Sequence, residues 1–84
     1  MAYYEREIVK EGRAVNVDKQ QVESDDARKT HHVFYHDDDK RIDKVRSVLG
    51  TGFEMKPVGG DVVIFLTRIE AGKLISQKLA SPEK

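Results

Sequence analysis

The stretch FEMKPVGGDVVIFLT, residues 53–67, decides the fold of this chain. Two runs of strand-forming residues flank Gly59-Gly60, a dipeptide typical of the tight turns that close β-hairpins. A two-residue loop then fixes the register of the hairpin. The expected cross-strand partners are Phe53 with Leu66, Met55 with Ile64 and Pro57 with Val62 on one face, and Glu54 with Phe65, Lys56 with Val63 and Val58 with Asp61 on the other. Because proline has no backbone donor, Pro57 predicts that its strand is a sheet edge.

A helix is expected directly before this hairpin, over roughly residues 38–49. Three aspartates at 37–39 stand where a helix N-terminus favours negative charge, and apolar residues follow at helical spacing. Gly50 supplies a C-terminal cap.

A second helix is expected directly after the hairpin, up to about Ala80. Thr67 and Glu70 have the spacing of a capping box. Gly72 inside this helix is unfavourable by about 1 kcal/mol relative to alanine, so it indicates either frayed ends or a close contact. The last four residues, 81–84, read as a tail.

The N-terminal part predicts further strands. Tyr3 to Lys10 and Arg13 to Asp18 read as a hairpin that turns at Glu11-Gly12. In that register Glu5 faces Asp18, a like-charge pair that argues mildly against it. Residues 19–29 are polar without a period and predict a mobile loop, with a short exposed helix as the alternative. Thr30 to His36 reads as an interior strand, because both of its faces carry apolar residues.

Together these elements predict a single α+β domain over residues 1–84, with the order β-β-β-α-β-β-α. Two amphipathic helices most simply cover one face of a five-stranded, mainly antiparallel sheet. The last five elements resemble the ferredoxin-like βαββαβ order without its final strand. An earlier strand can fill that place, as in a circular permutation. The resemblance concerns topology alone and implies no function.

Composition narrows the classes of function. The 84 residues include 15 basic and 15 acidic side chains, so no net field attracts nucleic acid or an anionic membrane. The chain has no cysteine, which excludes disulfides, thiolate metal sites and a thiol nucleophile, and fits a reducing compartment. No run approaches the ~20 apolar residues of a membrane span. We therefore expect a cytoplasmic protein that does not act in a membrane.

His31, His32 and His36 beside Asp37–Asp39 suggest a metal site, but the spacing argues against one. On a strand His31 and His32 point to opposite faces, and His32 and His36 lie about 13 Å apart at ~3.3 Å per residue. Surface or sheet histidines and helix-capping aspartates explain the cluster better. No convergent acid–base pair, P-loop or nucleophile elbow can be located either. We expect no metal, no cofactor and no catalytic residue, while an enzyme with a site around His32 or His36 at a dimer seam stays an alternative.

The run Val62–Leu66 suggests a binding surface, because two helices cover only one side of a sheet. Val58, Val63 and Phe65 would then form an apolar patch on the other side, with Glu54 and Lys56 on its charged rim. The equally weighted alternative is that the N-terminal hairpin or the 19–29 loop covers this patch within the same chain.

Two functions follow from these patterns. The first is a non-catalytic protein-interaction or regulatory module that binds through its sheet face or edge and forms a homodimer. The second is a small domain that binds RNA or single-stranded DNA through the N-terminal hairpin. The candidate residues for nucleic acid are Tyr3, Tyr4, Arg6, Lys10 and Arg13. Glutamates interleave with these cations and weaken that second interpretation.

Overall fold

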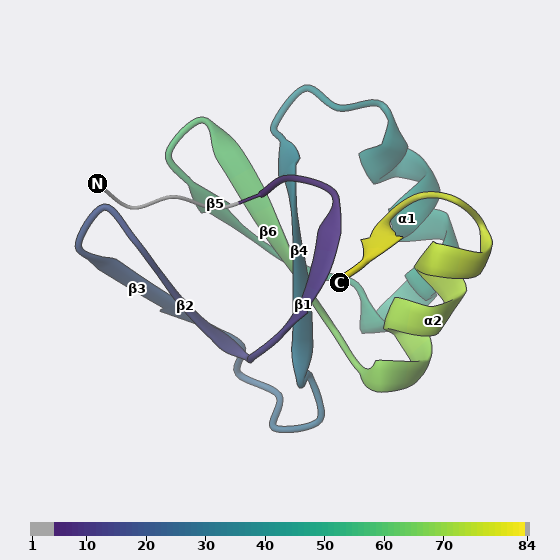
Figure 1. The fold of residues 1–84 in the computed structure, drawn as a ribbon, viewed down its shortest axis with the longest axis horizontal. Coiled ribbons are helices and arrows are strands. Elements are labelled where there is room, and N and C mark those ends of the chain that lie inside the picture. Colours follow the sequence, from purple (N-terminus) through teal and green to yellow (C-terminus); the bar gives the residue numbers. More distant parts are fainter. Residues whose placement is uncertain (1–4, 84) are drawn as a thin grey trace.

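A computed structural model describes residues 5–83, which form an α+β fold with helices on one side of a mixed sheet (Figure 1). The strands and helices are β1 (Ile8–Glu11), β2 (Ala14–Val17), β3 (Gln20–Glu23), β4 (His31–His36), α1 (Arg41–Leu49), β5 (Glu54–Val58), β6 (Asp61–Leu66), α2 (Arg68–Ser76) and β7 (Ser81–Pro82), with a 3₁₀ turn at Gly50–Gly52. The main sheet has the order β5-β6-β4-β1-β7, and β2 and β3 form a separate two-stranded sheet. The expected α+β class is therefore confirmed.

The β5–β6 hairpin has the register that residues 53–67 predict. Met55 pairs with Ile64, Pro57 with Val62, Glu54 with Phe65, Lys56 with Val63, and Val58 with Asp61. The expected pair of Phe53 and Leu66 is not part of the ladder, because β5 begins at Glu54. β5 is an edge strand, as Pro57 indicates, and β4 lies in the interior between β6 and β1. β1 sits beside β4, the place of the missing final strand in the ferredoxin-like order.

The main core fills the space between the helices and one face of the sheet. It is built from side chains that alternate along the strands and from the apolar stripes of both helices. Its largest fully buried members are Tyr35, Ile64, Leu66, Leu74, Val33 and Val45. Thr67 and Glu70 form the expected capping box at the start of α2, with Thr67 Oγ1 accepting a hydrogen bond from the Glu70 amide at 3.2 Å.

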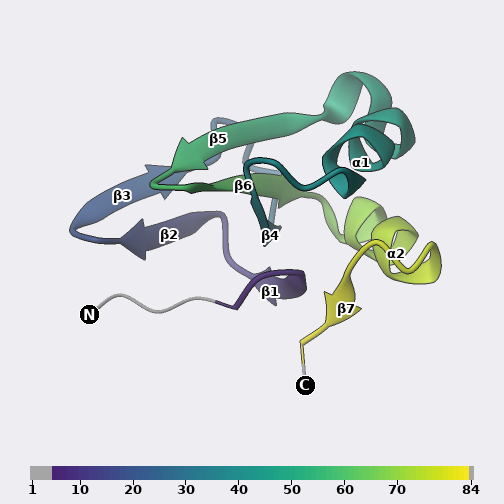
Figure 2. The same ribbon diagram turned by 90° about the horizontal axis from the view of Figure 1, so that it is seen from above.

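The predicted N-terminal hairpin is wrong. β1 pairs with β4 and β7, while β2 forms a hairpin with β3 across Asp18-Lys19, so residues 20–23 of the expected loop are a strand. Asp18 and Lys19 both have positive φ, at 49° and 65°, as a primed two-residue turn requires. Gly12, with φ at 125°, is instead the bend where the chain leaves the main sheet. Figure 2 shows the β2–β3 hairpin on the side of the sheet away from the helices.

The chain end also differs from the prediction. α2 ends at Ser76 rather than near Ala80, because Lys78 adopts a left-handed φ of 61° and turns the chain back. Residues 81–82, expected as tail, form β7 in parallel with β1, and the Ser81 amide donates to Glu7 O at 2.7 Å. Gly72 marks no close contact, since a Cβ there would meet nothing within 4 Å. Neither described helix is long and apolar enough to cross a bilayer.

Candidate functional site

The predicted apolar patch is not a surface. Val58, Val63 and Phe65 are between 0 and 1% exposed, and they pack with Phe34 under the valines of the β2–β3 hairpin. Burying a valine or phenylalanine side chain contributes roughly 1.5–3 kcal/mol, so covering this face stabilises the β2–β3 hairpin in its place. The expectation of an exposed patch is therefore wrong, and the alternative of cover by the same chain is correct.

Of the residues proposed for nucleic acid, the described ones, Arg6, Lys10 and Arg13, do not share a hairpin. Tyr3 and Tyr4 lie outside the described residues. Arg6 binds the buried carboxylate of Asp61, with Nε 2.9 Å from Oδ2. Lys10 lies on β1, and Arg13 follows the bend at Gly12 and donates to Ser24 O at 3.1 Å. The tyrosines expected to stack on bases lie outside the described residues, so the nucleic-acid function stays an untested prediction.

The three histidines have separate surroundings. His31 Nδ1 lies 2.9 Å from Thr30 Oγ1, at the surface. His32 is buried, with Nδ1 2.9 Å from Gly12 O, and burial lowers the pKa of His32. His36 is half exposed, and its Nδ1 lies 3.1 Å from Asp61 Oδ1. Within residues 5–83, no three His, Asp or Glu side chains stand close enough together to hold a metal ion.

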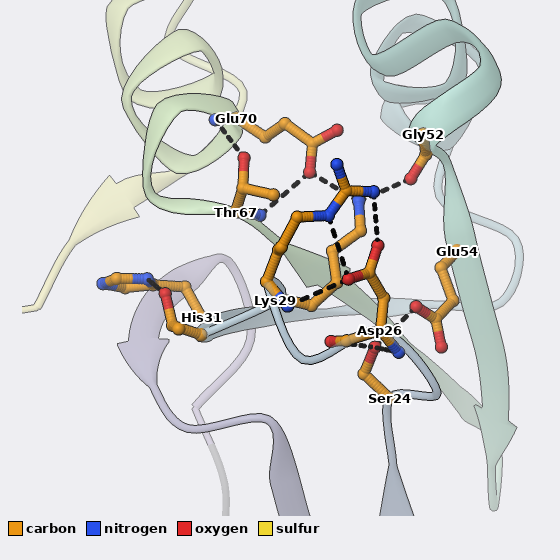
Figure 3. A network of polar contacts seen from close by, with 10 residues as sticks. Ser24, Asp26, Lys29, His31, Gly52, Glu54, Thr67 and Glu70 are labelled. Atoms are coloured by element: carbon orange, nitrogen blue, oxygen red, sulfur yellow. Dashed lines mark hydrogen bonds and ion pairs between the residues drawn. The ribbon is translucent and has the colours of Figure 1, made fainter.

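A polar network joins the 24–30 loop to the helix side of the molecule (Figure 3). Lys29, 4% exposed, donates from Nζ to Gly52 O and to Glu70 Oε1, both at 2.6 Å. Glu70 Oε1 also accepts the Thr67 amide at 2.9 Å, so the capping box of α2 is part of this network. We call the contacts of Lys29 with Gly52 and Glu70 the clasp.

A second group of contacts holds the start of the same loop. Ser24 Oγ donates to Glu54 Oε1 at 2.6 Å, and the Asp25 amide donates to Glu54 Oε2 at 3.2 Å. Hydrogen bonds from Arg28 lower the pKa of Asp26 to about 2. A cavity of about 410 Å³ lies among these groups and the clasp. Lys29 and Glu70 bind each other here, and the exposed Arg28 is paired with Asp26, so the arrangement serves to fix the loop.

A groove with different properties runs between β3 and β5. Its volume is about 420 Å³, and its lining residues are Gln20, Gln21, Val22, Glu23, Asp25, Lys56 and Pro57. Lys56, expected on the rim of the apolar patch, reaches across this groove from β5. Its Nζ donates to Glu23 O at 2.6 Å, with Asp25 Oδ2 at 3.6 Å and Glu54 Oε2 at 3.9 Å. We call this feature the β3–β5 groove.

One wall of the groove carries free backbone groups. Val17 and Gln20 close the two-residue turn, so the hydrogen-bonded pairs of the hairpin are Val17 with Gln20 and Val15 with Val22. The Ser24 amide, which donates to Arg13 O at 2.8 Å, continues this alternation. The N–H groups of Gln21 and Glu23 therefore point away from β2. Within the described part of the chain, neither has a partner.

Sequence reasoning missed both Lys29 and the groove. The segment 19–29 offers one large apolar residue, Val22, so neither a strand nor a buried lysine stands out from its pattern. A signal was nevertheless present, since Val15, Val17 and Val22 share one face if the turn is placed at Asp18-Lys19. Glu70 was found, but only as a capping residue.

The chain matches no protein-family model, no curated protein and no solved structure.

Proposed function

We propose that this protein is a non-catalytic interaction module that holds an extended segment of a partner protein in the β3–β5 groove. The observation that carries the proposal is the unpaired outer edge of β3. Extended peptides commonly add a strand to such an edge, and backbone hydrogen bonds supply much of their affinity.

The other edges of the fold support this choice of strand. Proline cannot donate to a ladder, and Pro57 stands in β5 while Pro82 stands in β7, the two edge strands of the main sheet. Both faces of the main sheet are covered, one by the helices and one by the β2–β3 hairpin. β2 and β3 both lack proline, but only β3 lines the groove, so β3 is the edge that we choose for strand addition.

The partner in this proposal is another protein chain rather than a second copy. The expected homodimer rested on the apolar patch, and that patch is covered by its own hairpin. A cytoplasmic setting is part of the proposal, supported by the cysteine-free sequence. A regulatory role follows if the bound segment belongs to a protein whose activity depends on it.

The test is a selection of displayed random peptides against the protein, followed by affinity measurements on two variants. Gln21→Pro removes the N–H that faces the groove. Asn16→Pro is the control, because Asn16 is the cross-strand partner of Gln21 and its N–H lies on the opposite side of the pair, away from the groove. We expect the selected peptides to bind wild-type and Asn16→Pro alike and Gln21→Pro at least about tenfold more weakly, a loss of about 1.4 kcal/mol.

Amide resonances of Gln21 and Glu23 should shift in the NMR spectrum when peptide is added. A selection that yields no binder, or binders that tolerate Gln21→Pro, would overturn the proposal. Both variants are first compared by thermal melting, which checks that proline destabilises the two strands to the same degree.

A further inference from the structure

The β3–β5 groove already holds one cation of its own chain. Lys56 Nζ sits among three oxygens, those of the Glu23 carbonyl and of the Asp25 and Glu54 carboxylates, at 2.6, 3.6 and 3.9 Å. These oxygens come from β3, from the loop that follows it and from β5. A cluster of acceptors around one ammonium group is chemically a cation subsite.

The charges around the groove favour positive ligands. Glu23 and Asp25 line the groove and bring two negative charges. Glu54, whose carboxylate also accepts hydrogen bonds from Ser24 and the Asp25 amide, adds a third beside the single positive charge of Lys56. The carboxylate of Asp25 is 93% exposed and is therefore accessible to an incoming chain. Charge complementarity of this kind contributes to the choice of partner more than to raw affinity.

Resting on the function proposed above, we infer that the groove selects an extended segment bearing lysine or arginine, whose charged head takes the subsite that Lys56 occupies. Lys56 Nζ binds Glu23 O, an acceptor that an added strand also needs. The incoming segment therefore displaces Lys56 and gains both the backbone acceptor and the carboxylates. Lys56 is the internal competitor of the ligand.

The experiment uses three seven-residue peptides with the pattern Thr-Val-X-Val-X-Val-Thr, blocked at both ends, in which X is lysine, glutamine or glutamate. Binding is measured from the amide shifts of Gln21 and Glu23. We expect the lysine peptide to bind at least about threefold more tightly than the glutamine peptide, and the glutamate peptide to bind most weakly.

Variants separate the subsite from general charge. Lys56→Met keeps the aliphatic stem and should raise affinity for the lysine peptide several-fold more than affinity for the glutamine peptide. Lys44→Met on α1 removes the same charge elsewhere and should leave this ratio unchanged. Asp25→Asn should weaken binding of the lysine peptide about threefold without affecting the glutamine peptide.

The outcomes distinguish this inference from the proposed function. Equal binding of all three peptides, with sensitivity to Gln21→Pro, would overturn the lysine or arginine selectivity and leave the interaction module standing. Failure of these peptides and of a random selection would overturn both. An unchanged lysine-to-glutamine ratio in Lys56→Met would show that Lys56 does not occupy the ligand's subsite.

Discussion

Lys29 and Glu70 form a buried ion pair at 2.6 Å across 41 positions of the chain, and this contact ties the 24–30 loop to the first turn of α2. Their side chains are 5 and 15% exposed. Replacing Lys29 by methionine leaves the Glu70 carboxylate without its cation and Gly52 O without its donor. We expect Lys29→Met to lower the free energy of unfolding by about 2–4 kcal/mol, measured by urea denaturation.

The double variant Lys29→Met with Glu70→Gln is the control for this prediction. It removes the unpaired charge, while the side-chain carbonyl of the introduced glutamine can still accept the Thr67 amide, so it should be more stable than Lys29→Met alone. A Lys29→Met protein within about 0.5 kcal/mol of wild type, the range of an ordinary surface substitution, would contradict a stabilising clasp.

Replacing Gly52 and Gly72 by alanine should change the free energy of unfolding in opposite directions. A Cβ on Gly52 would lie 2.6 Å from Glu70 Oε2, and the Lys29 and Thr67 contacts hold that carboxylate in place. A Cβ on Gly72 meets nothing within 4 Å. We expect Gly52→Ala to lower the free energy of unfolding by about 1–3 kcal/mol. Gly72→Ala, inside α2, should raise it by up to about 1 kcal/mol.

Thermal melting of the two variants side by side is sufficient to check this contrast. If Gly52→Ala melts at or above the wild-type temperature, the Glu70 carboxylate is free to move away and the clasp is looser than its distances indicate.

The hairpin at 53–67 was predictable from the sequence because residues close together in the chain determine its turn and register. Gly59-Gly60 fixes the loop length, the loop length fixes the register, and alternation then assigns each side chain to a face. The N-terminal hairpin failed because two turns competed there. Glu11-Gly12 has the better local turn chemistry, but a turn at Asp18-Lys19 lets three valines cover Val63 and Phe65. Tertiary burial outweighed local preference.

The same reason limits how much of the site could be predicted. Lys56 was singled out beside Val63, and its position on β5 is as expected. The partners that give Lys56 its significance, Glu23 and Asp25, lie in a segment read as a loop, and only the packing of the β2–β3 hairpin brings them to β5. Periodicity within one element carries no information about that arrangement.

His32 makes stability depend on pH. Burial is the largest influence on its pKa and lowers it, while the hydrogen bond to Gly12 O acts in the opposite direction. The neutral form is therefore favoured in the folded state, and the unfolded chain binds the proton more readily. Stability from this group is complete above the unfolded pKa of about 6.5 and is lost as pH falls from there through the lower folded pKa.

NMR titration of the His32 ring should thus give a midpoint below the ordinary histidine pKa of about 6.5. Urea denaturation should show lower stability at about pH 5 than at about pH 7, and His32→Gln should reduce that difference. A midpoint at or above the ordinary value would contradict the burial argument.

Phe65 and Ile69 offer the sharpest contrast between a buried apolar side chain and an exposed one. Phe65 is 0% exposed between the sheet and the β2–β3 hairpin, whereas Ile69 on α2 is 74% exposed. Phe65→Ala leaves a cavity in a layer only one hairpin thick, so we expect a loss of about 3–5 kcal/mol in the free energy of unfolding. Ile69→Ala should change it by less than about 0.5 kcal/mol. Because so small a domain has little stability to lose, Phe65→Ala should also show faster hydrogen exchange across β2 and β3. Exchange at the wild-type rate there would mean that the hairpin does not depend on Phe65 for its position.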